Sequence, residues 1–210
     1  IDILKYSLTV NQPVLNKVLD TLNNNSLSIE AKIELANYIQ NEQNLFNFAI
    51  QSTSPESISQ ILRYIHEYAD KRGAQVLIQQ TPEGHTALSL AAIESTEAIN
   101  HLLDGSSTIL NNYEKMQLVA PDNSGNTALH NIILELNKIS NPTDENVEEY
   151  INRVIAVLDN PYITSDMRQV LFAKNKNNDN PLHLAVKSGS PRLVGKILKH
   201  AGIHKEDIMV

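Results

Sequence analysis

Two histidines, His130 and His183, are the side chains whose type could most readily do chemistry, because an imidazole can bind a metal or transfer a proton near neutral pH. No second histidine at four-residue spacing and no Glu-x-x-His pair accompanies either of them, as a zinc site on a helix would require. We therefore interpret both as structural residues that hydrogen-bond the backbone of an adjacent turn. His85 and His101 carry no such pattern, and we expect both to face solvent.

The other candidate sites also lack the partners that chemistry needs. His200 and His204 stand four residues apart, but Gly202 between them predicts that the helix has ended. The chain has no cysteine, no Gly-x-Ser-x-Gly elbow and no glycine-rich phosphate loop. Four carboxylates gather in one short segment, where they could form a catalytic pair or the solvated start of a helix; the second reading suits the helix dipole. They are Asp144, Glu145, Glu148 and Glu149. We predict that the chain is not an enzyme and uses neither a metal nor a cofactor.

Composition narrows the possible partners. The 210 residues carry a formal charge of −7 and no dense block of lysine or arginine, which disfavours nucleic acid and anionic membrane surfaces. No apolar run approaches the ~20 residues of a membrane span, so we expect no membrane insertion. Aromatic residues make up only 5% and tryptophan is absent. The core must therefore consist of leucine, isoleucine, valine and alanine, which favours stacked helices.

The elements that would position these residues become visible when the chain is laid against itself. Residues 84–91, 125–132 and 178–185 align as Gly-His-Thr-Ala-Leu-Ser-Leu-Ala, Gly-Asn-Thr-Ala-Leu-His-Asn-Ile and Asn-Asp-Asn-Pro-Leu-His-Leu-Ala. Residues 44–49 match in register but without the turn. The equivalent positions Asn44, Thr86, Thr127 and Asn180 are 42, 41 and 53 residues apart.

Each aligned segment predicts a turn followed by a helix. Thr86, Thr127 and Asn180 can cap the free N–H groups of a helix start, and the residue after each occupies the first helical position. Gly84 and Gly125 permit the positive φ of a tight turn, and Asn178 is the usual substitute. Three leucines then enter the core, and two alanines leave room for a neighbouring unit. These are Leu88, Leu129 and Leu182, with Ala91 and Ala185.

A second helix follows each turn-and-helix segment, and the units also carry insertions. Apolar residues at helical spacing predict second helices near residues 58–65, 99–103, 154–158 and 193–198, and Pro13 to Leu22 predicts another at the amino end. Extra helices are predicted over 28–39, 108–119 and 165–173, and residues 137–146 are predicted to lengthen the loop of the third unit. Gly202 to Val210 match the start of one more inserted helix.

These motifs resemble the Thr-Pro-Leu-His-x-Ala signature of the ankyrin-repeat family, which residues 180–185 match except at the first position. The resemblance implies an all-α ankyrin-repeat solenoid of stacked helix pairs with extra inter-repeat helices, forming one domain over 1–210. Its units would be about 1–43 (partial), 44–85, 86–126, 127–179 and 180–210 (partial). HEAT and armadillo repeats also have periods near 40 residues, but the Gly-x-Thr-Ala-Leu turn favours the ankyrin reading.

In that family a concave surface of turn tips and first-helix positions holds a partner protein. Carried over by position, the tips and exposed helix positions here are Pro82, Glu83, His85, Glu94, Asn123, Ser124, Asn126, Glu135, Lys176, Asn177, Asp179 and Lys187. We expect the tip side chains to pack against nothing. Tyr64, Tyr68, Tyr113, Tyr150 and Tyr162 are either interface anchors or boundary packing. A rival contact surface is the inserted helices, for example at Arg168.

The resemblance therefore implies a protein–protein interaction module that is monomeric and cytoplasmic, with a partner of unknown identity. Its long irregular repeats and its Asn- and Ile-rich usage resemble ankyrin modules of effectors that intracellular bacterial pathogens secrete into the host-cell cytoplasm, which would give it a role in virulence. The alternatives are a cytosolic eukaryotic scaffold and a substrate-recruiting fragment of a larger enzyme.

Overall fold

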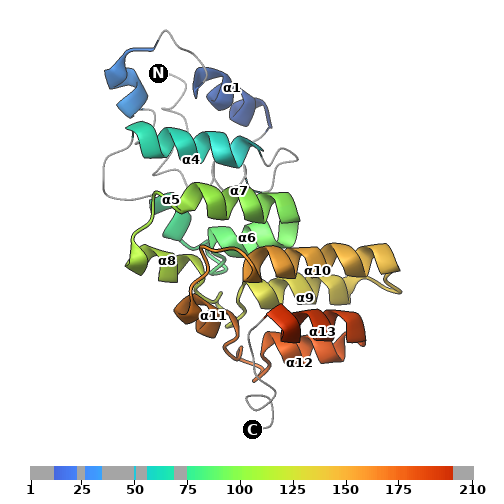
Figure 1. Ribbon diagram of the computed structural model, residues 1–210. Coiled ribbons are helices and arrows are strands. Elements are labelled where there is room, and N and C mark those ends of the chain that lie inside the picture. The colour runs from blue at the N-terminus through green and yellow to red at the C-terminus, as the bar shows by residue number, and fades with distance from the viewer. Residues whose placement is uncertain (1–11, 23–26, 35–49, 51–55, 69–74, 201–210) are drawn as a thin grey trace.

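The computed structural model describes residues 12–22, 27–34, 50, 56–68 and 75–200 (Figure 1), and within these residues every regular element is a helix. The predicted all-α class is thus confirmed for the described part of the chain. Residues 29–34 are also helical. The helices that lie wholly within the described ranges are α1 (Gln12–Leu22), α4 (Glu56–Tyr68), α5 (Gln75–Ile78), α6 (Ala87–Glu94), α7 (Thr96–Ser106), α8 (Asn112–Leu118), α9 (Ala128–Lys138), α10 (Asp144–Leu158), α11 (Ser165–Leu171), α12 (Pro181–Lys187) and α13 (Pro191–His200).

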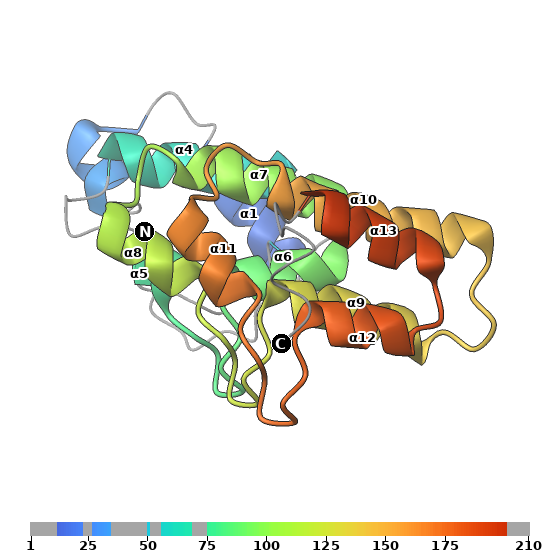
Figure 2. The same ribbon diagram turned by 60° about the horizontal axis from the view of Figure 1, so that its bottom comes forward.

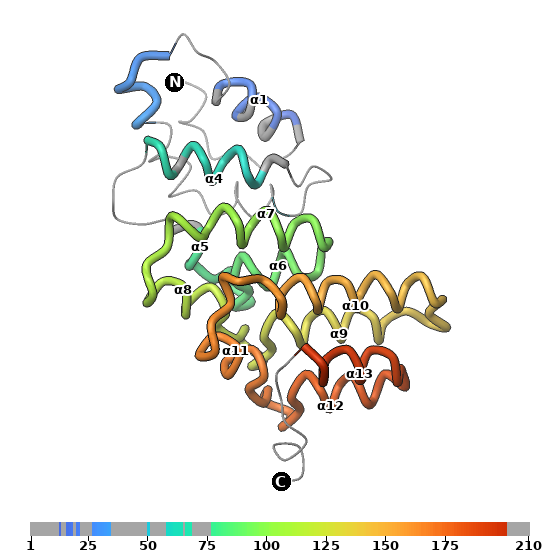
Figure 3. Tube along the Cα trace, viewed as in Figure 1, coloured from blue at the N-terminus to red at the C-terminus, as the bar shows by residue number. Residues whose placement is uncertain are grey.

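Three helix pairs stack on one another in chain order. The pairs are α6 with α7, α9 with α10, and α12 with α13, and each pair contacts the next (Figures 1 and 2). Helices α6, α9 and α12 form one layer, which we name the first-helix layer. Helices α4, α7, α10 and α13 form the second-helix layer, and α1 packs on α4. The tube in Figure 3 shows the chain pass through the same sequence of positions in successive pairs.

The short helices α5, α8 and α11 form a third column beside the pairs (Figure 2), since α8 contacts both of the others. The prediction of extra helices is confirmed at α8, at α11 and over residues 29–34. Helix α5 was missed, because four residues are too few to show a helical period. Residues 35–39, 44–49 and 201–210, on which other predictions fall, lie outside the described ranges.

The predicted core positions are buried. Leu88 and Leu129 are fully inaccessible, and Leu182 of the last pair is 8% exposed. Ala91 and Ala185 are also fully buried, which is consistent with close packing of adjacent helices in the first-helix layer. Each buried leucine contributes about 1.5–3 kcal/mol relative to an exposed one, so stacking of pairs supplies stability that no single pair could obtain.

Helix starts at Thr86 and Asn180 follow the predicted capping chemistry, whereas the Thr127 hydroxyl does not cap α9 and instead donates to the Leu171 carbonyl at 2.8 Å. The Thr86 hydroxyl accepts the Ser89 N–H at 3.1 Å, and the Asn180 side chain accepts the His183 N–H at 2.8 Å. The Ser190 hydroxyl accepts the Leu193 N–H at 3.2 Å at the start of α13. These bonds satisfy N–H groups that a helix start otherwise leaves without a partner.

Two predicted boundaries are wrong. The inserted helix expected from residue 108 begins at Asn112, because Asn111 and Glu114 form a capping box there. The loop expected over 137–146 shrinks to residues 139–143, because α9 continues to Lys138 and Thr143 caps α10. The extra residues of the third unit therefore lengthen its two helices and leave a short loop between them.

Two arginines tie neighbouring elements together. The buried Arg153 of α10 donates to the carbonyl oxygen of Ile93 near the end of α6, pairs with Glu149, and lies 4.6 Å from the centre of the Tyr150 ring. Carbonyls at a helix end have no partner within the helix, so this arginine satisfies a group that burial would otherwise penalise. Arg168 of α11 donates to the carbonyl oxygens of Leu158 and His200.

Candidate protein-binding surface

Three turns of one design precede the helices of the first-helix layer and project side by side from the stack (Figure 2). In the turn of residues 122–126 the Asp122 N–H donates to the Asn126 carbonyl, and the Gly125 N–H donates to the Asp122 carbonyl, both at 2.8 Å. The turns of residues 81–85 and 175–179 repeat both bonds at 2.8–2.9 Å. The shared geometry explains why the three segments align in sequence.

The fourth residue of each turn adopts a left-handed backbone. Gly84 has φ of 88°, Gly125 has 79° and Asn178 has 63°. Only glycine enters this region freely, and asparagine tolerates it better than other side chains. The predicted roles of all three residues are confirmed.

Backbone hydrogen bonds join the turns to one another. The Asn123 N–H donates to the Glu83 carbonyl at 3.1 Å, and the Lys176 N–H donates to the Ser124 carbonyl at 3.0 Å. A Cβ atom on Gly84 would lie 2.5 Å from the Asn123 nitrogen, and one on Gly125 would lie 3.0 Å from the Lys176 nitrogen. The glycines therefore serve both the turn conformation and the close approach of the next turn.

Asparagine side chains strengthen this row of turns. The Asn123 amide donates to the Pro82 carbonyl at 2.8 Å, and the Asn175 amide donates to the Asn126 side-chain oxygen at 2.8 Å. The expectation that tip side chains pack against nothing is therefore wrong for Asn123 and Asn126. These two hydrogen bonds help to fix the spacing between turns, because each joins a side chain of one turn to a polar group of the neighbouring turn.

His130 connects the first-helix layer to the row. Its Nε2 donates to the Asp179 carbonyl at 2.9 Å in the next turn, and its Nδ1 accepts the Thr127 N–H at 3.2 Å. The ring is fully inaccessible, and burial lowers the pKa of His130 below its ordinary value although the bond to the Asp179 carbonyl opposes that shift. The imidazole is thus held neutral, with its proton on Nε2. The structural role predicted for His130 is confirmed.

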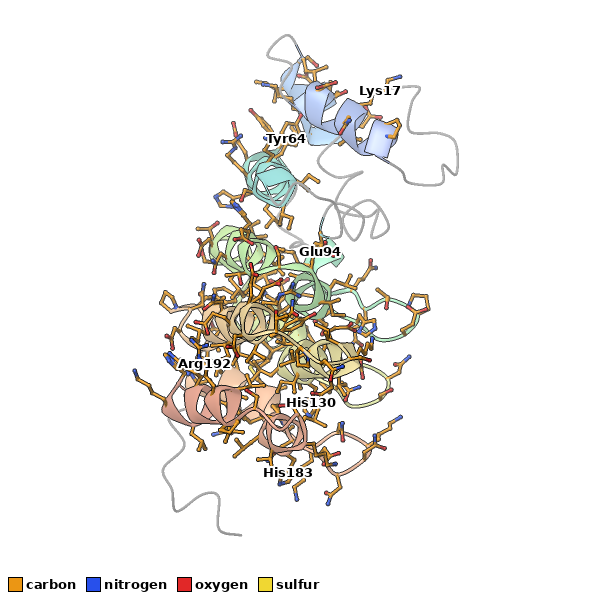
Figure 4. The ribbon with its side chains drawn as sticks, turned by 90° about the vertical axis from the view of Figure 1, so that its right-hand side faces the viewer. Lys17, Tyr64, Glu94, His130, His183 and Arg192 are labelled. Atoms are coloured by element: carbon orange, nitrogen blue, oxygen red, sulfur yellow. The ribbon has the colours of Figure 1, made fainter. Side chains whose placement is uncertain are left out.

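His183 occupies the same place in the last pair but is exposed (Figure 4). Its Nδ1 accepts the Asn180 N–H at 3.3 Å, which repeats the local half of the His130 arrangement. His85 and His101 depart from the prediction that their side chains face solvent. His85 is half-buried with its Nδ1 3.7 Å from Asp122, and His101 is half-buried with its Nδ1 2.6 Å from the Ser59 hydroxyl.

The predicted contact residues fall into two groups. One group lies in the three turns of residues 81–85, 122–126 and 175–179, which we name the turn row. It places a carboxylate at its first tip and an ammonium group at its third. The exposed members are Pro82, Glu83, Asn123, Ser124, Lys176 and Asn177, with His85, Asn126 and Asp179 half-buried. Hydrogen bonds from its own backbone and from Thr81 lower the pKa of Glu83, so that carboxylate is charged at neutral pH.

The first-helix positions lie at the far ends of their helices. Glu94 and Glu135 are half-buried, so the expectation that they are exposed is wrong, and Glu135 pairs with Lys138 at 2.5 Å. Lys187 is exposed, but its ammonium reaches Asp179 at 2.6 Å. Glu135 and Lys187 are therefore partly neutralised by these ion pairs, whereas within the described residues no ion pair involves Glu94, Glu83 or Lys176.

A groove on the second-helix layer was not predicted. It encloses about 710 Å³ between α7 and α10, with Ile155 and Ala156 on its wall, and most of the acidic group assigned to a helix start also lines it. Asp144 and Glu145 do occupy the first turn of α10, as predicted. Glu148 instead pairs with Arg192 at 2.7 Å. Only the contact between two second helices creates this groove, so no single segment of sequence could reveal it.

The tyrosines divide between packing and exposure. Tyr64 and Tyr162 are buried, and burial raises the pKa of Tyr64 to about 12 and raises that of Tyr162 further. Tyr68 and Tyr150 are partly buried, whereas Tyr113 of α8 is 73% exposed. Boundary packing therefore accounts for four of the five, and Tyr113 alone of this set keeps the character of an anchor for a partner.

Among the described residues no group of three or more His, Asp or Glu side chains could hold a metal ion. None of the described helices combines the length and apolar character that crossing a membrane requires. No protein-family model matches the chain, and no significant match to a curated protein or to a solved structure was found.

Proposed function

We propose that the chain is a protein-binding module of the ankyrin-repeat kind, and that a partner protein docks on the row of turns and the adjoining first-helix layer. The observation that carries this proposal is the row itself: three turns of one geometry, locked together by backbone and asparagine hydrogen bonds. A surface held in one conformation loses little entropy on binding, and this preorganisation favours affinity.

The side chains of the turn row suit a polar contact that fixes the orientation of the partner. Glu83 at one end and Lys176 at the other place opposite charges along the three tips, with Asn123 and Ser124 between them. Complementary charges set the orientation of a partner and raise its association rate more than its affinity. The partner we propose is accordingly a protein segment with basic groups facing the first tip and acidic groups facing the third.

Two further points belong to the proposal. The module has no catalytic activity of its own, and its setting is an effector secreted by a bacterium into the cytoplasm of a host cell. A reporter-fusion translocation assay on the full-length protein tests the setting. Turnover of a hydrolase or transferase substrate that disappears on mutation of His130 or His101 would overturn the first point.

The binding face is tested by capture followed by titration. The 210-residue chain is used as bait in host-cell lysate, and partners that it enriches are purified and titrated against variants. Glu83→Lys and Lys176→Glu should each weaken binding several-fold, more at low salt, because exposed charges are screened within ~8–10 Å at physiological ionic strength. The matched control is Gln169→Lys on the exposed side of α11, which should leave affinity unchanged. If Gln169→Lys weakens binding while both turn variants bind normally, the contact lies on the third column instead. Arg168 is not used as the test residue on that column, because its side chain is already hydrogen-bonded to two carbonyl oxygens.

A further inference from the structure

Helix α10 is longer than the second helices on either side of it. It has 15 residues, whereas α7 has 11 and α13 has 10. The buried leucines Leu103 of α7 and Leu158 of α10 close the matching apolar faces of their helices, so the extra residues of α10 lie at its start. Figures 1 and 2 show this first half of α10 projecting past the start of α7. On its α7 side, this part of α10 borders the groove of about 710 Å³.

One continuous face of α10 lines the groove. The lining residues of this helix recur at three- and four-residue spacing, which places them on one side of the helix. They run from Glu145 through Glu149 and Asn152 to Ile155 and Ala156. A stripe of this kind is a surface on which another helix can pack, because its side chains form a ridge for the grooves of a second helix.

The groove is acidic. Four of its lining side chains are glutamates, one on α7 and three on α10, and none of them is lysine, arginine or histidine. Two of these carboxylates already meet an arginine, since Glu148 pairs with Arg192 of α13 and Glu149 pairs with Arg153. The other two, Glu97 of α7 and Glu145 of α10, are exposed.

Glu97 and Glu145 bring like charges to the two walls of one groove. Within the described part of the chain neither takes part in an ion pair. Where α13 covers α10, it brings an arginine to the glutamate that it meets. The α7 side contributes a further glutamate to the groove instead of a cation, so this side of α10 is complementary to a basic surface.

The wall of the groove also has an apolar part. Ile155 and Ala156 are only half-buried there. Lysine and arginine side chains cover apolar surface with their methylene stems while their charged ends remain near water or a carboxylate. Apolar wall and carboxylates together therefore suit long basic side chains better than a small cation.

We propose that a basic helix of another protein docks in this groove and lies along the first half of α10. Its arginine or lysine side chains face Glu97 and Glu145, and their stems cover Ile155. The formal charge of −7 disfavours a second copy of the chain as the occupant, because two such copies repel one another. The groove belongs to the second-helix layer and the turn row to the first-helix layer, so this contact does not depend on the proposed function.

The probe is a fluorescein-labelled helical peptide of about 20 alanine, glutamine and arginine residues, a length at which an isolated helix can form. Its arginines recur at four-residue spacing on one face, and fluorescence anisotropy follows its binding to the full 210-residue chain. Glu97→Gln with Glu145→Gln should weaken binding about fivefold or more at low salt and less at physiological salt. Asn152→Glu, which adds a carboxylate to the same face, should strengthen it. Loss of folding cannot produce that gain.

Two controls separate docking in the groove from general attraction to an acidic protein. Glu83→Gln with Asp166→Asn removes the same charge from the turn row and from α11, and should leave peptide binding unchanged. A peptide of the same composition with its arginines spread around the helix should bind more weakly. Equal weakening by the two double variants, or equal binding of the two peptides, would overturn the proposal. Concentration-dependent dimerisation of the chain alone, abolished by Glu97→Gln with Glu145→Gln, would also overturn it by showing that a second copy is the occupant.

Discussion

The Nε2 atom of His130 lies 2.9 Å from the carbonyl oxygen of Asp179, so that a helix of one unit is hydrogen-bonded to the turn of the next. The His130 ring is fully buried, and a buried donor that loses its partner costs more than one at a surface. It is the contact that most directly converts separate helix pairs into one continuous surface.

Replacing His130 should therefore destabilise the chain more than replacing its counterpart in the last pair. His130→Ala should lower the free energy of unfolding by about 1–3 kcal/mol, because it leaves the Asp179 carbonyl short of a donor. His183→Ala, at an exposed position, should cost about 0.5 kcal/mol or less. Urea unfolding of both variants measures the difference. Equal losses of unfolding free energy would show that the His130 bond to the next turn does not stabilise the stack.

Stability should fall on acidification through His130. Its folded-state pKa lies below the ordinary value of 6.5, so below pH ~6.5 the unfolded chain binds a proton that the folded chain refuses. The contribution is complete above pH ~6.5 and is lost as the pH falls toward the folded-state pKa. The His130→Gln variant should show a shallower loss between pH 6.5 and 5 than the wild type does. Parallel curves for the two proteins would contradict the buried neutral ring.

Alanine substitutions at Gly189 and Gly84 separate two contributions to stability, the cost of a left-handed backbone and the cost of steric crowding. Gly189 has a positive φ of 70° but open space around its Cβ position, so Gly189→Ala should cost only the left-handed backbone, about 1–2 kcal/mol. Gly84→Ala adds a Cβ at 2.5 Å from the Asn123 nitrogen and should cost about 1–3 kcal/mol more. Equal stability of the two variants in chemical denaturation would contradict the close approach of Asn123 to Gly84.

Core truncations should follow the stacking order. Leu129→Ala, at a fully buried position, should lose about 2–5 kcal/mol, and Leu182→Ala should lose less because that leucine is already 8% exposed. Lys187→Ala, on the surface of the same pair, should stay within about 0.5 kcal/mol. A larger loss of unfolding free energy at Leu182 than at Leu129 would contradict the order of burial seen at these two positions.

The sequence predicted well those elements that depend on interactions between residues close together in the chain. Turns, caps and helix pairs depend on residues three or four positions apart, such as Thr86 and Ser89 or Gly125 and Asp122. The inserted helices were placed with errors at their ends, because Thr108 and Asn111 are both acceptable caps and only the glutamate at 114 decides between them.

The site was less predictable because its decisive bonds join residues far apart in the chain. Asn123 and Pro82 are 41 positions apart, and His130 and Asp179 are 49 apart. Tip positions could be assigned from the repeat, but which tip amides are engaged depends on the distance between turns. The half-burial of Glu94 and of His101 likewise depends on packing across units, which no repeat alignment contains.

Site-specific photo-crosslinking tests the proposed binding face most directly. A photoreactive residue replaces one exposed side chain at a time: Glu83, Ser124 or Lys176 in the turn row, Asn152 on the second-helix layer, or Gln169 on the third column. Each labelled chain is incubated with the captured partner and irradiated. The proposed function predicts crosslinks from the three turn positions and little from Asn152 or Gln169. Efficient crosslinking from Asn152 or Gln169, with none from the turn row, would contradict it.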